Sequence, residues 1–261
     1  MIYIPTYGRL HKQRTIKWFG KRDLARTVLV VRKSEEREAV RMYGRILGGV
    51  VTCAGLGVAA ARQRALEVAK EDVIAFFDDD LQFCQRVKDW DIDTNNHALK
   101  PTQSEVDAAV QWLFDNTSEE YPVTALGPRG GNNTIEERWT VENTRIMRSF
   151  AVHRPTLLKH NIRFDAFYYW EDFHVALSLL ELGYKNLVNV DAITGGDTNS
   201  AGGVARHLHK MWETIRAFKE EHPTIRIREK HMNDGDRKSS TGKVVVPDMT
   251  VYWKKAFRSK V

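Results

Sequence analysis

The segment VIAFFDDD, residues 73–80, constrains the fold more than any other part of the sequence. Its first five residues are apolar, which fits a strand buried on both faces, and such strands belong to parallel sheets covered by helices. Asp78, Asp79 and Asp80 follow at once. Like charges in a partly dry environment repel and raise each other's pKa, so these carboxylates need a positive partner. The segment therefore predicts a buried strand with a binding site at its carboxyl end.

Strand-like and helix-like segments alternate along the rest of the chain. The predicted strands are the apolar or β-branched runs 1–5, 27–32, 48–53, 73–77 and 121–127. Helical patterns are found at 58–70, 104–116, 172–186 and 204–222. This alternation is typical of a Rossmann-like α/β fold, a mostly parallel sheet flanked by helices. We expect a single domain over residues 1–222, followed by a basic extension, 223–261, that can pack on it.

Two features are absent from the sequence, and each absence argues against a class of protein. Neither end carries a charged-flanked apolar stretch as long as a signal peptide or a membrane span, so we expect a cytoplasmic protein without a membrane partner. Cys53 and Cys84 stand apart, each beside a predicted strand, which argues against a disulfide framework and a zinc site. Both should be buried thiols.

The formal net charge of +6 lies in the C-terminal extension. Residues 226–261 contain ten Lys or Arg and four Asp or Glu, so the rest of the chain is neutral on balance. Tyr252, Trp253 and Phe257 are interleaved with these charges, a mixture expected of a surface that binds phosphates and stacks a base. A solvated basic tail on a cytosolic protein fits the same composition equally well.

The three aspartates favour a divalent cation. In an extended segment Asp78 and Asp80 point to one side and Asp79 to the other. Asp78 and Asp80 can then hold Mg²⁺ or Mn²⁺, which prefer oxygen ligands and bridge a diphosphate, while Asp79 meets a ribose or sugar hydroxyl. A solvated turn capped by aspartate is the alternative, and the five apolar residues before it disfavour that interpretation.

A second motif supports a rival hypothesis. GLGVAA, residues 55–60, follows a predicted strand, opens a helix and fits the dinucleotide-binding pattern, with Asp78 about 20 residues further on. The glycines follow the third strand, however, and a ribose-binding acid does not need two more beside it. In either case Arg62, in the first turn of that helix, can meet a phosphate, although an exposed arginine is nearly as plausible.

Two later features add candidate site residues. Glu171 and Asp172 precede an apolar helix, where Asp172 can act as a general base or cap the helix, and the cap is the more common role. His207 lies beside the inner stripe of its helix and is a candidate metal ligand, whereas His209 is on the polar face. A packed, hydrogen-bonded histidine is an equally good interpretation of His207.

In this order, IYIPTYGR, GLGVAAARQRA, FFDDDLQF and FDAFYYWEDFHVALSLLELGYKN resemble the landmarks of GT-A glycosyltransferases. More narrowly, they resemble the phage TET-associated glycosyltransferase family, over about residues 2–222. Members are implicated in adding sugars to oxidised methyl groups of 5-methylpyrimidines in phage DNA, such as 5-hydroxymethylcytosine, made by a TET-like dioxygenase. The resemblance therefore implies a GT-A-like fold, a nucleotide-sugar donor and a DNA acceptor.

The resemblance also implies roles for particular residues. Asp78 and Asp80 match the D-x-D metal element, and Glu171 with Asp172 matches the acidic pair that supplies the base in inverting members. Thr6 and Arg9 match residues that approach the nucleotide, and His207 matches a late histidine ligand of the metal.

The expected reaction is displacement at the anomeric carbon of a UDP-sugar. The metal and Arg62 would offset charge on the departing diphosphate, and Asp172 would deprotonate the acceptor hydroxymethyl group. A non-DNA acceptor, an NAD(P)-binding oxidoreductase and a binding module without catalysis remain alternatives at this point.

Overall fold

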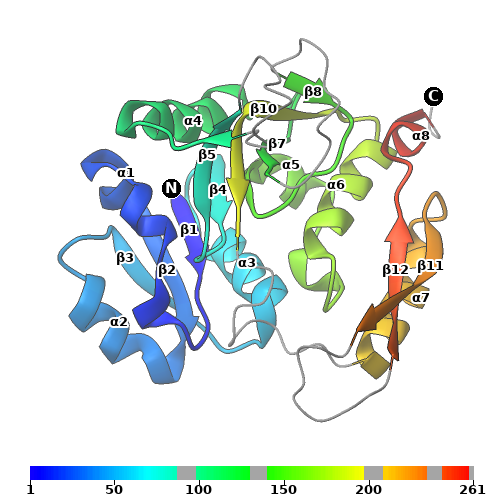
Figure 1. Ribbon diagram of the computed structural model, residues 1–261, viewed down its shortest axis with the longest axis horizontal. Helices are drawn as coiled ribbons and strands as arrows, with labels where there is room; N and C mark the ends of the chain where they lie inside the picture. The colour runs from blue at the N-terminus through cyan, green and yellow to red at the C-terminus, as the bar shows by residue number, and fades with distance from the viewer. Residues whose placement is uncertain (87–97, 130–139, 197–207, 234–242, 259–261) are drawn as a thin grey trace.

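The computed structural model describes residues 1–86, 98–129, 140–196, 208–233 and 243–258. Its strands are β1 (Ile2–Pro5), β2 (Thr27–Arg32), β3 (Gly49–Cys53), β4 (Val73–Phe77), β5 (Gln82–Arg86), β6 (Ala98–Leu99), β7 (Val123–Pro128), β8 (Thr140–Glu142), β9 (Ser149–His153), β10 (Asn186–Gly195), β11 (Arg226–Asn233) and β12 (Lys243–Thr250). The α-helices are α1 (Lys21–Ala25), α2 (Glu36–Tyr43), α3 (Gly57–Val68), α4 (Gln103–Asn116), α5 (Arg154–Lys159), α6 (Glu171–Glu181), α7 (Leu208–Glu221) and α8 (Trp253–Arg258) (Figure 1).

Ten of the described strands form one mixed sheet in the order β3-β2-β1-β4-β9-β7-β10-β5-β6, with β8 paired to β10. Strands β3, β2, β1 and β4 run parallel to one another. Strand β9 lies antiparallel between β4 and β7, and β5 runs antiparallel to β10. The predicted parallel half is confirmed, while the antiparallel strands β5, β8 and β9 and the parallel strand β10 were not predicted.

Side chains alternate between the two faces of the sheet, as the two-residue period of a strand requires. On β4, Ile74 and Phe76 point into one core cluster, which α3, α5 and α6 cover. Ala75 and Phe77 point into the other, which α2 and α4 cover. The apolar run at 73–77 is therefore explained by helices on both faces of its strand.

Strand β1 lies where the order of the strands reverses. Its neighbours are β2 on one side and β4 on the other, and both run parallel to it. The carboxyl ends of β1 and β4 therefore meet at one edge, which is where open α/β sheets bind ligands. Pro5 and Asp78 lie at this edge, and the chain order alone thus places the aspartates in a crevice.

The C-terminal extension is folded rather than a solvated tail. Strands β11 and β12 form an antiparallel hairpin, and α8 follows it. A third apolar cluster joins α6, α7, the hairpin and α8, and it includes Leu177, Phe218, Met249 and Ala256. In Figure 1 this module stands on the side of the molecule opposite to α1 and α2.

The aromatic residues of the extension were predicted to stack a base, and two of them do not have this role. Trp253 packs edge-to-face on Phe173 of α6 at a centroid distance of 5.2 Å. Phe257 is partly buried against the same cluster. Burial of apolar surface against α6 thus explains these two side chains, and Tyr252 is 45% exposed.

The two cysteines have the predicted state. Cys53 and Cys84 are free and buried. Among the described helices, none has the length and apolar character needed to cross a membrane.

A buried polar network links α6 to the end of α7. His174 Nδ1 lies 2.9 Å from His222 Nε2, and His222 Nδ1 lies 3.0 Å from the carboxylate of Glu181. Both imidazoles are buried, and Phe167 and Phe218 pack around them. Burial and the neighbouring His222 lower the pKa of His174 to about 3. His174 is therefore neutral in the folded protein at every pH near neutrality.

This pKa shift predicts acid sensitivity. Because an unfolded histidine has a pKa of about 6.5, the unfolded chain binds a proton below that pH that folded His174 does not bind. The free energy of unfolding should fall by about 1.4 kcal/mol per pH unit below 6.5, or about 2 kcal/mol at pH 5. Urea unfolding at pH 7 and pH 5 measures this. His174→Gln should weaken the pH dependence, and exposed His209→Gln should leave it unchanged; equal slopes in all three proteins would contradict the assignment.

Candidate functional site

A cavity of about 800 Å³ opens at the carboxyl ends of β1 to β4. One side is formed by these strand ends and by the start of α3, with Thr6, Gly57 and Arg62. The other side is formed by the segment before β9, the start of α6 and the β11–β12 hairpin. Asp78 and Asp79 therefore line a cavity shared by the sheet and the C-terminal module, and Asp80 follows them in the chain.

Arg62 of α3 holds two acidic groups from distant parts of the chain. Its Nη2 donates to Asp78 Oδ1 at 2.8 Å, and its Nη1 donates to Glu171 Oε1 at 2.5 Å. The side chain is only 3% exposed, and its guanidinium lies over the Phe150 ring. Burial opposes the charge of Arg62, but Glu171 and Asp78 outweigh it, and the pKa of Arg62 is raised. The arginine is thus a fixed cation between two carboxylates.

Asp79 forms a buried ion pair with Arg9, which also contacts Asp80. Arg9 donates from Nε to Asp79 Oδ2 at 3.2 Å and from Nη2 to Asp79 Oδ1, and its Nη1 contacts Asp80 at 3.2 Å. Burial raises the pKa of Asp79 to about 7, although Arg9 opposes the shift. Arg9 contacts both oxygens of Asp79, and the expectation that Asp79 also meets a sugar hydroxyl stays a prediction.

Glu171 and Asp172 lie at the start of α6 and line the same cavity as Asp78 and Asp79. Trp170 precedes them in the left-handed conformation, with φ of 62°, and it rather than Asp172 is the N-cap residue. Asp172 Oδ1 accepts from the amide of Phe173 at 2.9 Å, so its carboxylate also helps to satisfy the helix start. Burial raises the pKa of both acids, against the effect of Arg62. Glu171 is held by Arg62, whereas Asp172 is half-buried and faces the cavity.

The predicted nucleotide contacts have different surroundings. Thr6 is buried, and its hydroxyl accepts from Gln13 Nε2 at 2.8 Å. Arg9 is 14% exposed and is engaged by the aspartates. Gly57 begins α3 with φ of 88°, a conformation that favours glycine, and Tyr168 lies beside it. Thr6, Arg9, Gly57 and Tyr168 all line the cavity.

The TET-Associated Glycosyltransferase family matches residues 1–203. The chain belongs to this family. No curated protein shows a significant match to the sequence.

Solved structures with the same fold are distant in sequence. S. aureus TarS 1–349 in complex with UDP-GlcNAc is 13% identical, with a TM-score of 0.51 over 84% of this chain and 65% of that one. Glucosyl-3-phosphoglycerate synthase from Mycobacterium tuberculosis, with Mn²⁺, UDP and glucosyl-3-phosphoglycerate, is 12% identical, with a TM-score of 0.51 over 97% of this chain and 90% of that one. Both are GT-A glycosyltransferases, which confirms the predicted fold class. The chain spans less than two thirds of the TarS structure.

The glycine-rich motif has a different place in this glycosyltransferase family member than in a dinucleotide-binding protein. GLGVAA follows β3, which is the edge strand of the sheet. In a dinucleotide-binding fold the glycines follow the strand at the reversal of strand order, which here is β1. Asp78 accepts a hydrogen bond from Arg62 rather than being unpaired and available to a ribose hydroxyl. The position of the motif and the family membership both disfavour the oxidoreductase hypothesis.

Five cationic residues of the cavity were not predicted from the sequence, and one of them is Arg32 at the end of β2. Arg145 and Arg148 precede β9, and Arg228 and Lys230 belong to β11. Arg148 has φ of 61°, and its carbonyl accepts from the amide of Asp78 at 2.9 Å. Recognition of SFAVH as a strand paired with β4 would have placed Arg148 opposite the aspartates. Left-handed non-glycine residues are often found at functional sites, as Arg148 and Trp170 are here.

The metal-binding prediction concerns three residues, and the structure describes two of them. His207 lies outside the described residues, and so the proposed third ligand is not placed. Asp78 and Asp80 lie within the described part of the chain, where no group of three His, Cys, Asp or Glu is arranged to hold a metal ion. Together with burial, the charges of Asp80 and Asp78 raise the pKa of Asp79, so the three carboxylates lie close together.

The Arg62 bridge predicts a specific cost for its removal. Arg62→Met removes the cation that is hydrogen-bonded to both Asp78 and Glu171, and breaking a buried pair in this way typically costs about 3–5 kcal/mol. Urea unfolding at pH 7.5 measures the loss. The double variant Arg62→Met/Glu171→Gln should recover part of it, since one of the stranded charges is removed.

Arg64→Met is the matched control on the same helix. Arg64 is 46% exposed and 3.8 Å from Glu67, so its loss should change stability by no more than about 0.5 kcal/mol. If Arg62→Met were as harmless as Arg64→Met, the buried bridge would not stabilise the fold.

Proposed function

We propose that this chain transfers a sugar from a nucleotide sugar, best a UDP-sugar, to a hydroxymethylated pyrimidine base in DNA. The observation that carries the proposal is the Arg62 bridge, which fixes Asp78 and Glu171 in one cavity and leaves Asp172 open to it. The bridge thereby holds Asp78, on the donor side of the cavity, near the acidic pair at the start of α6, on the acceptor side.

The donor is assigned to the sheet side of the cavity. Parallel strand ends and the start of α3 provide backbone amides, and nucleotide ligands in α/β proteins occupy this position. Neighbours with this fold were solved with UDP-GlcNAc or with UDP and Mn²⁺. Thr6 and Arg9 line this part of the cavity. Arg62 is committed to two carboxylates, so Arg148 is the better candidate for the diphosphate.

The residues present fit a divalent cation of the Mg²⁺ or Mn²⁺ type. Such ions often take one or two carboxylates from the protein and further oxygens from a diphosphate. Asp78 and Asp80 are the carboxylates that would hold the ion, with His207 as a further candidate. The bound ion would supply positive charge to the departing diphosphate.

The transfer itself needs one proton acceptor. The acceptor oxygen forms a bond to the anomeric carbon, the bond from that carbon to the diphosphate oxygen breaks, and the hydroxyl proton passes to Asp172. A raised pKa makes Asp172 a stronger base than an ordinary aspartate, and Arg62 beside it keeps its charged form accessible. This role requires inversion at the anomeric carbon.

Support for the DNA acceptor comes from the family and from charge. The family name links these proteins to TET enzymes, and a TET-like dioxygenase would supply the oxidised methyl group. The cavity side opposite the donor carries Arg145, Arg228 and Lys230, which suit a polyanion. Mass spectrometry of hydroxymethylated DNA nucleosides after incubation with Mn²⁺ and a panel of nucleotide sugars tests the reaction. Unchanged nucleosides with every donor would exclude this acceptor.

The first prediction of this proposal concerns the metal. Asp78→Asn and Asp80→Asn should each abolish transfer, because these acids are the proposed ligands of the ion. In wild-type protein, UDP with Mn²⁺ at 100 times Kd should raise stability by about 2.7 kcal/mol, and this gain should be lost in both variants.

Thermal melts with and without UDP and Mn²⁺ measure the gain. Asp115→Asn, an exposed change on α4, is the control and should behave as wild type. A wild-type melting temperature indifferent to UDP and Mn²⁺ would contradict the donor site.

The second prediction separates catalysis from capping at Asp172. Asp172→Asn should lower kcat by about 10²-fold or more and leave UDP binding unchanged, since a general base acts in the transition state. Glu171→Gln should affect turnover less and stability more, because Glu171 contacts Arg62. Kinetics per folded molecule, with melts beside them, give both quantities. A lower melting temperature with unchanged turnover would make Asp172 a structural residue only.

A further inference from the structure

The side of the cavity opposite the donor is built in part by a hairpin that the family match does not include. The family matches residues 1–203, and the hairpin residues Arg228 and Lys230 lie beyond them. Hydrophobic contacts with α6 hold the hairpin against the cavity. This wall is therefore a stable surface of the protein that the family match leaves unassigned.

Arg228 and Lys230 stand two residues apart on β11, so they share one face of the strand. Arg228 is paired across the hairpin with Asp248, from Nη2 to Oδ2 at 2.8 Å. Lys230 is exposed and lines the cavity. Among the described residues, Lys230 has no salt-bridge partner, so its charge is available to a ligand.

Arg145 completes this wall from the sheet side. It is exposed, lines the cavity and lies over the Phe173 ring at 4.9 Å. Burial lowers the pKa of Arg145, and the charges of Asp172 and Asp248 oppose this shift, so both carboxylates lie near its guanidinium. No carboxylate in the described part of the chain forms a salt bridge with it. Because Asp248 neutralises Arg228, the wall keeps two positive charges, those of Arg145 and Lys230.

We propose that Arg145 and Lys230 form a phosphate-binding subsite for the acceptor, and that it takes the phosphodiester on the 5′ side of the target nucleotide. This inference rests on the proposed function. In a pyrimidine nucleotide in the common anti conformation, the C5–C6 edge of the base lies on the side of the 5′-phosphate. A nucleotide with its C5 hydroxymethyl group at Asp172 therefore brings that phosphate toward Arg145.

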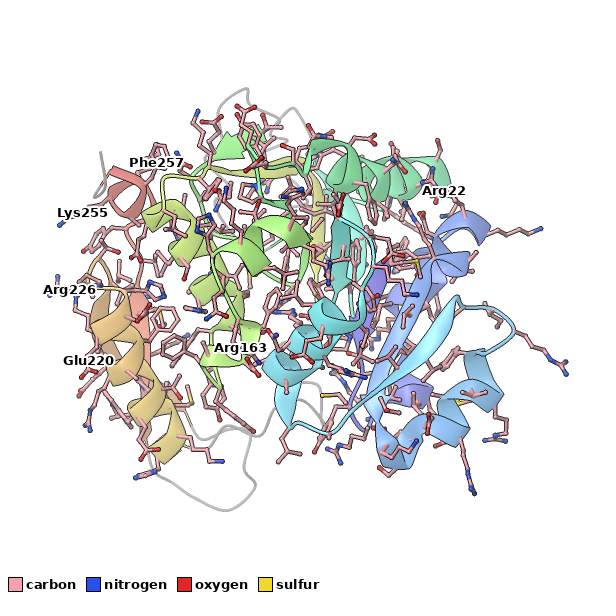
Figure 2. All side chains as sticks on the ribbon, turned by 180° about the vertical axis from the view of Figure 1, so that it is seen from behind. Arg22, Arg163, Glu220, Arg226, Lys255 and Phe257 are labelled. Atoms are coloured by element: carbon pink, nitrogen blue, oxygen red, sulfur yellow. The ribbon has the colours of Figure 1, made fainter. Side chains whose placement is uncertain are left out.

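The position of the subsite also bears on how DNA reaches Asp172. The base must enter a cavity that the hairpin bounds on one side, and enzymes that act on bases commonly take them out of the stack. A phosphate contact next to the target would hold the backbone while the base occupies the cavity. The basic residues of α8 do not contribute to this wall: Lys254 and Lys255 are exposed and do not line the cavity (Figure 2, Lys255 at the edge of the molecule).

The test removes the charge from each partner in turn. The protein variant is Arg145→Gln/Lys230→Gln, which leaves the Arg228–Asp248 pair intact. The DNA variant is a hydroxymethylated oligonucleotide with one neutral methylphosphonate 5′ to the target. Each change alone should lower affinity, measured by fluorescence anisotropy with UDP and Mn²⁺, by about tenfold. In the double variant the methylphosphonate should cost less than about twofold, because the contact is already lost.

Two controls make the result specific. Lys254→Gln/Lys255→Gln removes the same number of charges from α8 and should keep the full response to the methylphosphonate. A methylphosphonate several nucleotides away should have little effect in wild type. Equal losses in both double variants, with the methylphosphonate effect retained in both, would mean that the charges act at long range and would overturn the subsite.

Failure of the inference and failure of the proposed function give different results. If wild-type protein glycosylates DNA but ignores the methylphosphonate, the subsite is wrong and the function stands. If it binds DNA with the expected methylphosphonate response but adds no sugar, the subsite stands and the reaction is wrong. Finally, 5-hydroxymethyl-2′-deoxycytidine is compared with its 5′-monophosphate. A phosphate preference here that needs Arg145 and Lys230, without any DNA effect, would overturn the assignment to DNA and favour a free phosphorylated acceptor.

Discussion

The structure depends on one buried cation. Arg62 donates to Asp78 from the sheet edge and to Glu171 from α6, and it is almost completely excluded from water. Two carboxylates from segments far apart in the chain could not approach this closely in a dry region without a cation between them. The bridge therefore sets the relative position of the strand that carries the aspartates and the helix that carries Asp172. Arg9 does the same locally for Asp79.

Helix α6 transmits this arrangement to the rest of the molecule. One face packs on the sheet through Val175 and Leu179, and another packs on the C-terminal module through Leu177 and Leu180. A helix buried on two sides has few ways to move, since both cores are close-packed. The acids at its first turn are thus held by apolar packing from two directions as well as by Arg62.

Local patterns were enough to predict much of the fold and the centre of the site. The strands at 27–32 and 73–77 and the helix from 172 are marked by strong apolar periodicity, and Asp78 follows directly from the strand before it. Arg62 was placed near a phosphate because of its position in its helix, whereas its partners are set by tertiary contacts that the sequence does not display. The basic hairpin was the hardest to predict, because residues 226–230 contain only one apolar residue, Ile227, which is partly buried, among four charged ones. Such a strand is apolar only where a partner covers it.

The sheet side and the hairpin side of the cavity differ in how substitutions affect the rest of the fold. The sheet side is formed by strand ends that also carry the main core, so substitutions at Thr6 or Asp79 disturb buried hydrogen bonds or ion pairs. The hairpin side presents exposed residues such as Lys230 on a two-stranded element with its own apolar anchor. Changes to that face alter charge and shape without breaking a buried contact. Under the proposed function, donor recognition is therefore tied to fold stability, whereas the proposed acceptor wall can change independently of it.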